Sequence, residues 1–172
     1  MAGLQGKVAV VTGGSRGVGR GVAEGLAEAG ATVYITGRSQ STATPPAERT
    51  IQATAASVDA VGGAGIAVAL DHNDDAAVEA LFERVRNEQG RLDILVNNVY
   101  KIPNPPVFGG GFWEHPVSVW DDQCGVGLRG YYVASVYGAP LMVAQGSGLI
   151  VNISSRGGDE YVFSTSYGEG KS

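Results

Sequence analysis

Cysteine is nearly missing from this sequence of 172 residues, in which Cys124 stands alone. A single cysteine excludes an internal disulfide framework and any cysteine-based zinc site. Such usage fits a reducing compartment, so we expect a cytoplasmic protein. Histidine is also scarce, with two residues in the chain. Because no second ligand stands near His72, we expect it to lie in an exposed loop, and we expect no metal site.

Long hydrophobic runs and an excess of positive charge are missing as well. No apolar run approaches the length of a membrane span, and no basic leader with an apolar core opens the chain, so no membrane segment is expected. Lys and Arg number 12 against 17 Asp and Glu, for a net charge of −5. Without a local concentration of basic residues, this balance argues against a nucleic-acid partner. The length suits a single domain spanning residues 1–172.

Glycine, by contrast, is abundant, with 27 residues, and the chain is organised around a glycine-rich stretch near its start. Residues 7–26 read KVAVVTGGSRGVGRGVAEGL. The continuous apolar run of residues 8–11 is typical of a strand buried on both faces of a parallel sheet. Val18, Val22 and Leu26 recur at helical spacing, which predicts a helix after the glycines. A strand, a glycine turn and a helix in this order predict a phosphate cradle.

Each glycine of this turn has its own place in the predicted cradle. Gly13 allows a positive φ, Gly17 lets a pyrophosphate approach the backbone, and Gly19 permits close contact between helix and strand. The free N–H groups at the helix N-terminus would face the anion. Such glycines could merely serve a tight turn, but the strand before them and the helix after them favour a dinucleotide.

The rest of the chain alternates predicted strands with predicted helices. The further strands are expected at residues 31–36, 65–70, 91–96 and 147–153, and the helices at 47–61, 74–90 and 120–144. This alternation predicts an α/β fold with a doubly wound parallel sheet. Residues 101–119 form an unusually long connection, which we expect to be a lid over a substrate pocket rather than a disordered segment.

The residue that stands about 20 positions after the glycine turn favours NADP(H) over NAD(H) as the cofactor. In a dinucleotide site, an Asp or Glu at the end of the second strand would bind the 2′-hydroxyl of the adenosine ribose. Arg38 stands there instead, and Arg16 inside the turn adds a second positive charge. Guanidinium groups suit a 2′-phosphate. If both arginines were merely solvated, NAD(H) would remain possible.

Polar pairs follow the fourth and fifth predicted strands. Asn97-Asn98 and Ser154-Ser155 stand at the carboxyl ends of these strands, where ligands of open α/β sheets bind. The amide pair could hold neighbouring loops or touch a cofactor. Tyr167 and Lys171 come next, and residues four apart share one face of a helix. Taken alone, such a pair would most often be a solvated helix face.

In this setting, Tyr167 and Lys171 indicate acid–base chemistry. A free phenol is a poor acid or base at neutral pH, but a fixed positive charge nearby stabilises the phenolate. Lys171 could supply that charge. Tyr167 would then donate a proton to a carbonyl oxygen as hydride arrives at the carbon, or remove one from an alcohol in the reverse direction. Ser155 would hold the same oxygen, with Ser154 as the alternative.

Four motifs in this order resemble those of the short-chain dehydrogenase/reductase family: T-G-x-x-x-G-x-G at residues 12–19, Asn97-Asn98, Ser155 to Gly158, and Tyr167-x-x-x-Lys171. The resemblance implies a Rossmann fold with strand order 3-2-1-4-5 and an oxidoreductase acting on a small carbonyl or alcohol substrate. It implies that Ser155, Tyr167 and Lys171 are catalytic, and it implies a homodimer or homotetramer. It also places Asp71 beside the adenine amino group. The candidate cofactor-binding residues are Gly13, Ser15, Arg16, Gly17, Val18, Gly19, Arg38, Asp71, His72, Asn98, Tyr167 and Lys171.

The sequence departs from the family's pattern in three places. Val99 and Tyr100 replace the usual Ala-Gly pair, so the backbone beside the cofactor is expected to differ. Gly127 stands where the family often has an asparagine that supports a proton path to the lysine. The family's usual last strands do not follow Lys171, so we expect the chain to be truncated. The alternative function is therefore a nucleotide-binding scaffold or sensor with little or no turnover.

Overall fold

The computed structural model describes residues 3–40 and 47–172 of the chain. Five parallel strands form one sheet in the order β3-β2-β1-β4-β5. Their bounds are Val8–Val11 for β1, Thr32–Gly37 for β2, Ala64–Ala69 for β3, Ile94–Asn97 for β4 and Leu149–Asn152 for β5. The chain reverses its direction of travel across the sheet at β1, which opens a ligand crevice at the carboxyl ends of β1 and β4. The predicted α/β fold and its strand order are confirmed.

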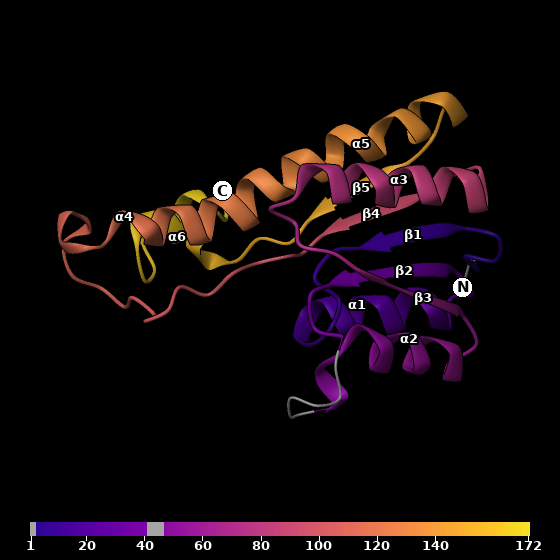
Figure 1. Cartoon of the computed structure of the whole chain (residues 1–172), viewed down its shortest axis with the longest axis horizontal. Coiled ribbons are helices and arrows are strands. Elements are labelled where there is room, and N and C mark those ends of the chain that lie inside the picture. Colours follow the sequence, from indigo (N-terminus) through magenta and orange to yellow (C-terminus); the bar gives the residue numbers. More distant parts are fainter. Residues whose placement is uncertain (1–2, 41–46) are drawn as a thin grey trace.

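Helices cover both faces of the sheet (Figure 1). On one face lie α1 (Gly17–Glu28) and α2 (Ile51–Ala60), and on the other lie α3 (Asp75–Gln89) and α5 (Gly130–Gln145). Alternate residues of β1 supply the two cores, because side chains of a strand point to opposite faces. Val10 shares one core with Phe82 of α3, and Val11 shares the other with Ala23 of α1. No helix in the described ranges is both long and apolar enough to cross a membrane.

The helix predicted over residues 47–61 begins later than expected. A short 3₁₀ turn, Ala47–Arg49, comes first, and α2 starts only at Ile51. Thr50 causes the break, because its backbone is extended and its hydroxyl accepts a hydrogen bond from the N–H of Ala53 at 3.1 Å. The prolines expected to precede this helix, at positions 45 and 46, lie outside the described residues.

The helix predicted over residues 120–144 is built from three pieces. These are α4 (Val117–Trp120), a π-helical stretch, Asp121–Arg129, and α5. Glycines at positions 125 and 127 fall inside the π-helical stretch and lower its preference for regular α geometry. The last helix, α6 (Thr165–Glu169), lies beside α4 at the same end of the molecule (Figure 1).

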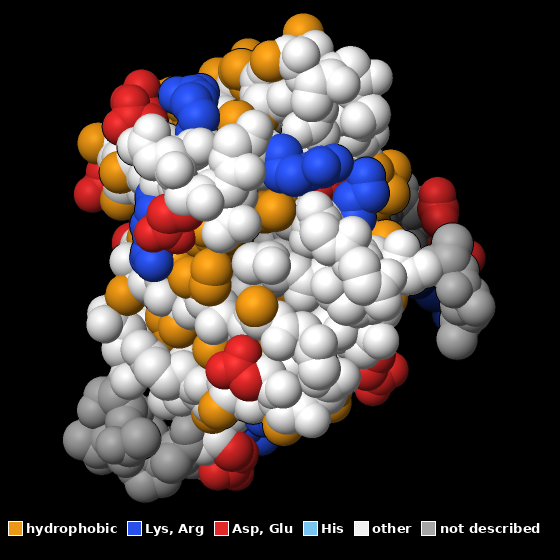
Figure 2. Space-filling model, turned by 90° about the vertical axis from the view of Figure 1, so that its right-hand side faces the viewer, with side chains coloured by type: hydrophobic (Ala, Val, Ile, Leu, Met, Phe, Trp, Pro, Cys, Tyr) orange, Lys and Arg blue, Asp and Glu red, His pale blue; other side chains and the backbone are white. Residues whose placement is uncertain are grey.

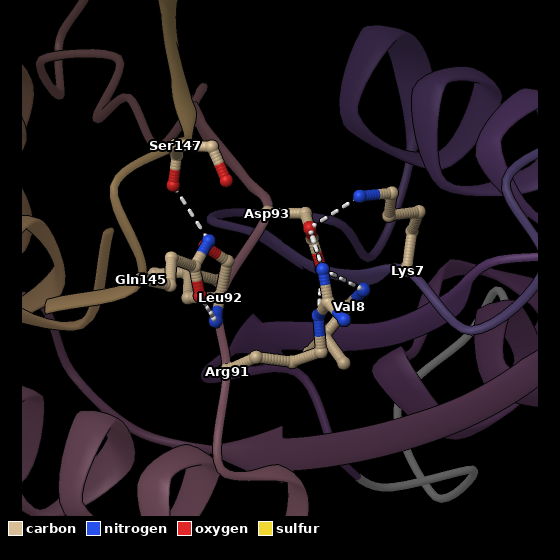
Figure 3. A network of polar contacts seen from close by, with 7 residues as sticks. All are labelled: Lys7, Val8, Arg91, Leu92, Asp93, Gln145 and Ser147. Atoms are coloured by element: carbon tan, nitrogen blue, oxygen red, sulfur yellow. Dashed lines mark hydrogen bonds and ion pairs between the residues drawn. The ribbon is translucent and has the colours of Figure 1, made fainter. Parts of the chain in front are cut away.

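At the opposite end of the sheet, a network of polar contacts joins the beginnings of β1 and β4. The carboxylate of Asp93 accepts hydrogen bonds from Lys7 Nζ at 3.0 Å, from the Val8 N–H at 2.9 Å and from Arg91 Nε at 2.7 Å (Figure 3). Gln145 extends the network toward β5, because its Nε2 donates to the carbonyl of Leu92 at 2.7 Å and to that of Ser147 at 2.6 Å. Figure 2 looks onto this end of the molecule, where Lys and Arg side chains gather near the middle of the face.

We expect Asp93→Asn to lower the free energy of unfolding by about 2 kcal/mol at neutral pH. The Asp93 side chain is only 7% exposed. Burial opposes its ionisation, but hydrogen bonds from Arg91, Val8 and Lys7 outweigh burial and lower the pKa of Asp93 to about 2. Since this pKa lies below the ordinary value, the stabilisation is complete above about pH 4 and is lost as the pH falls toward the folded-state pKa.

Urea unfolding of the wild type and of Asp93→Asn at several pH values measures this contribution. The exposed Asp159 is a matched control, because Asp159→Asn should change stability by no more than about 0.5 kcal/mol. The gap between the wild type and Asp93→Asn should narrow as the pH falls below about 4. A gap that stayed constant with pH would show that the charge of Asp93 is not what stabilises this end of the sheet.

Candidate functional site

A cavity of about 470 Å³ opens at the carboxyl ends of the strands. Its lining brings together residues that are far apart in the sequence. Of the residues predicted to bind a cofactor or to catalyse, the lining includes all but Gly19: Gly13, Ser15, Arg16, Gly17, Val18, Arg38, Asp71, His72, Asn98, Ser155, Tyr167 and Lys171. The cavity thus runs from the glycine turn to the loop after β5.

The glycine turn has the backbone shape that its sequence predicts. Gly13 has a φ of 66° and Gly17 a φ of 56°, both in the left-handed region that favours glycine. At Gly19, a Cβ atom would lie 2.4 Å from Nδ2 of Asn98 and 2.6 Å from the carbonyl oxygen of Gly13, so only glycine fits. Arg16 precedes α1 without a side-chain cap, which leaves the first N–H groups of the helix available to an anion.

Asn98 holds this turn against the end of β4. Its side-chain amide donates to the carbonyl oxygens of Thr12 and Gly13, both at 2.9 Å. In return, Oγ1 of Thr12 accepts hydrogen bonds from the N–H groups of Asn98 at 2.9 Å and Val99 at 3.1 Å. Of the two roles predicted for the amide pair, holding loops together is therefore seen directly. Thr12 begins the T-G-x-x-x-G-x-G motif, but the sequence alone predicted no separate role for its side chain.

Arg38 and Asp71 lie together at the far end of the cavity from the tyrosine. Nη1 of Arg38 is 3.6 Å from Oδ2 of Asp71, and the two side chains are 61% and 42% exposed. An ion pair this open to solvent is weak. Asp71 also accepts a hydrogen bond from the N–H of Asn73 at 3.0 Å. Both charged groups can therefore turn toward a ligand at little energetic cost.

The expectation that His72 lies in an exposed loop is wrong. His72 is only 2% exposed, and its Nε2 lies 2.8 Å from Oγ1 of Thr36 at the end of β2. Burial lowers the pKa of His72 to about 4, so the ring is neutral at pH 7. The buried Nδ1 has no hydrogen-bond partner among the described residues. Thr36 lies 36 positions earlier in the chain, so no local sequence pattern indicates this contact.

Ser155 and Tyr167 lie next to each other in the cavity lining. Their hydroxyl oxygens are 2.8 Å apart, which is a hydrogen-bond distance. Tyr167 is positioned by α6, whose capping residue Ser164 accepts a hydrogen bond from the Tyr167 N–H at 3.1 Å. Ser154 instead donates to the backbone carbonyl of Lys171. Of the two serines considered from the sequence, Ser155 is the one beside Tyr167.

Lys171 is buried in the same cavity, although the helix predicted to carry it ends two residues earlier, at Glu169. A hydrogen bond from its N–H to the carbonyl of Gly168, at 3.0 Å, continues the turn and directs the side chain inward. Its Nζ donates to the Ile153 carbonyl at 3.2 Å and to the Tyr131 hydroxyl at 3.4 Å. Burial lowers the pKa of Lys171.

Two tyrosines that the sequence did not indicate surround this ammonium group. Nζ of Lys171 lies 4.8 Å from the ring centre of Tyr100 and 5.7 Å from that of Tyr131. Burial, together with Tyr167, raises the pKa of Tyr131 to about 12, so its hydroxyl stays protonated beside Lys171. The ring faces partly compensate the cost of burying a cation.

Comparison with known proteins shows the family of this chain. The model of the short chain dehydrogenase family matches residues 7–172. The chain belongs to this family. Dehydrogenase/reductase SDR family member 1 from Mus musculus is 49% identical over 176 residues, a match that covers 99% of this chain and 53% of the relative. The Bacillus subtilis oxidoreductase YxbG is 34% identical over 158 residues, covering 92% of this chain and 53% of the relative.

Solved structures of short-chain dehydrogenases have the same fold. A metagenomic short-chain oxidoreductase in complex with NADP superposes with a TM-score of 0.84 at 34% identity, covering 98% of this chain and 71% of the other. This short-chain dehydrogenase chain spans about half the length of the curated relatives it matches.

The long segment of this short-chain dehydrogenase, residues 101–119, does not lie across the cavity as the predicted lid would. Within it, Ile102 contributes to the cavity lining. The rest turns away from the sheet (Figure 1) and packs beside the residues before α6, where the N–H of Gly109 donates to the Phe163 carbonyl at 2.8 Å. The segment also contains a 3₁₀ turn, Phe112–Glu114, and ends at α4.

Proposed function

We propose that this chain carries the cofactor-binding and acid–base site of an NADP(H)-dependent oxidoreductase that interconverts a carbonyl and an alcohol. The observation that carries the proposal is the Ser155–Tyr167 hydroxyl pair at 2.8 Å, which shares one cavity with buried Lys171 and the glycine turn. Acid–base groups placed beside a dinucleotide cradle suit hydride transfer coupled to proton transfer.

The residues present fit a dinucleotide. The positive φ angles of Gly13 and Gly17 shape a cradle that a Cβ atom would strain, and the uncapped start of α1 offers N–H groups to a pyrophosphate. Arg16 and Arg38 line the same cavity and provide positive charge for a 2′-phosphate. When bound, NADP(H) would supply the hydride to the carbonyl carbon or accept it from the alcohol.

The chain's own residues would handle the proton. The hydroxyls of Ser155 and Tyr167 are hydrogen-bonded to each other in the cavity lining, and a substrate oxygen placed beside them could accept a hydrogen bond from each. Tyr167 would give its proton to that oxygen during reduction, and Ser155 would keep the oxygen in position. The buried ammonium of Lys171 would stabilise the negative charge left on the phenol oxygen.

Arg38→Ala should weaken NADPH binding by about 10- to 100-fold and leave NADH binding nearly unchanged. The reason is that only NADPH carries the 2′-phosphate that the guanidinium would bind. Titration of the purified protein with each cofactor, followed by cofactor fluorescence, measures both constants. Arg156→Ala is the matched control, because Arg156 is exposed and paired with Glu160 outside the cavity lining. Equal weakening of both cofactors would contradict the 2′-phosphate assignment.

A second candidate function is a nucleotide-binding scaffold or sensor with little turnover. Gly127 favours it, because this position has no side chain to relay protons toward Lys171. A Cβ atom there would lie 3.7 Å from the Tyr100 ring and 3.9 Å from the Gly170 carbonyl oxygen. The two functions differ in a simple assay. Protein that binds NADPH but reduces no member of a carbonyl panel would support the scaffold.

A further inference from the structure

A chain of aromatic rings leads away from the hydroxyl pair. Tyr167 makes edge-to-face contacts with Tyr100, at a centroid distance of 5.9 Å, and with Phe163, at 5.2 Å. Phe163 in turn contacts Phe108 at 5.4 Å. The four residues come from the loop after β4, the long segment, the loop before α6 and α6 itself. We call Tyr100, Phe108, Phe163 and Tyr167 the aromatic wall.

Phe163 occupies a strained backbone conformation. Its φ of 65° makes it the one non-glycine residue with positive φ in the described part of the chain. A bulky aromatic residue rarely adopts this region, and strain of this kind concentrates at functional sites. Its carbonyl accepts the N–H of Gly109 at 2.8 Å, which ties it to the long segment. The ring lies against Tyr167, and Phe163 is 45% exposed.

Exposed apolar side chains lie along part of the aromatic wall. Tyr100 and Ile102 line the cavity together with Tyr167, and Ile102 and Phe108 are 63% and 71% exposed. Two lysines lie near Tyr100: Lys171, whose ammonium is 4.8 Å from the ring centre, and its neighbour in sequence Lys101, which is paired with Asp122. Exposed apolar groups that gather beside a reacting group indicate a binding surface for an apolar part of a ligand.

Building on the proposed function, we propose that the aromatic wall is a specificity subsite for substrates whose carbonyl carbon bears an aromatic ring. Such a ring would continue the edge-to-face series while its carbonyl oxygen meets the hydroxyls of Tyr167 and Ser155. Phe163 determines the preference, because its ring contacts both Phe108 and Tyr167 and its backbone has the unusual φ of 65°.

The test compares benzaldehyde with cyclohexanecarbaldehyde, two substrates of similar size of which one is aromatic. The kcat/KM with NADPH is measured for both, in the wild type and in Phe163→Ala. The ratio of the two values within one protein removes effects common to both aldehydes. Comparing that ratio between the wild type and the variant removes the difference in intrinsic reactivity between the two aldehydes. Phe163→Ala should lower the benzaldehyde preference by about 2- to 10-fold, the effect expected for one ring contact.

Two further variants separate recognition from folding. Phe163→Tyr retains the ring and should keep the wild-type ratio. Trp113→Ala removes an aromatic side chain that is 76% exposed and lies outside the aromatic wall, and it should also keep the ratio. An unchanged NADPH affinity in Phe163→Ala shows that the cofactor site has survived the substitution.

The outcomes are distinct. A ratio that is the same in the wild type and Phe163→Ala, or a loss that affects both aldehydes equally, would overturn the subsite while leaving the proposed oxidoreductase intact. Reduction of cyclohexanecarbaldehyde without reduction of benzaldehyde would also overturn the subsite and leave the proposed oxidoreductase intact. Protein that binds NADPH and reduces neither aldehyde nor any member of the carbonyl panel would overturn the proposed function, and the subsite would fall with it.

Discussion

Tyr167→Phe should lower kcat for carbonyl reduction by about 10²- to 10⁴-fold, the range typical of losing a general acid. The substitution removes one oxygen atom and retains the ring, which makes its edge-to-face contacts with Tyr100 and Phe163. The hydroxyl it removes lies 2.8 Å from Oγ of Ser155, and no other phenol occupies that place. NADPH affinity should therefore change little, since the glycine turn and Arg38 remain.

Steady-state kinetics with NADPH, together with a fluorescence titration of the cofactor, measure the two effects separately. Tyr161→Phe is the matched control. Tyr161 is 64% exposed, and its hydroxyl donates to the Gly110 carbonyl at 3.5 Å, the limit of a hydrogen bond. The same chemical change should therefore leave kcat unaltered. If Tyr167→Phe kept wild-type activity, the proton would have to come from another group, and the assignment of Tyr167 would be wrong.

The fold could be predicted because its signals are local. The apolar run of residues 8–11 indicates a strand with both faces buried, and β1 supplies both cores. Asp74 and Gly90 bound α3 as predicted, the first by accepting the N–H of Ala77 and the second by adopting a φ of 68°. Capping and periodicity act over a few residues, so one sequence displays them.

The parts of the site that escaped prediction depend on contacts between distant residues. Buried His72 is hydrogen-bonded to Thr36, and Lys171 is held by Tyr131 and the Ile153 carbonyl. No short pattern connects these positions. The positive φ of Phe163 could not be predicted either, because an aromatic residue does not indicate this conformation. The hydrogen bond that accompanies it comes from Gly109, in the distant long segment. The four sequence motifs indicate which residues are catalytic candidates. The residues that surround those candidates are set by tertiary packing.

Lys171→Met should have opposite effects on activity and stability. Methionine is unbranched and apolar like the stem of lysine, is one atom shorter and has no charge. Burial lowers the pKa of Lys171, which means that the folded protein holds this ammonium group at an energetic cost. Removing the charge removes that cost, so the melting temperature should stay the same or rise. The variant also loses the hydrogen bonds to Ile153 and Tyr131, which moderates the gain.

Activity should nevertheless fall by about 10²- to 10³-fold in Lys171→Met, the effect typical of removing one electrostatic stabiliser from a preorganised site. Lys101→Met is the control, since Lys101 pairs with Asp122 and does not line the cavity. The pH profile adds a second test. Because the charged form of Lys171 is the useful one and its pKa is lowered, wild-type activity should decline on the alkaline side before an exposed lysine would titrate. A variant that lost stability and activity together would indicate a structural role instead, because only a charge held at a cost for catalysis separates the two.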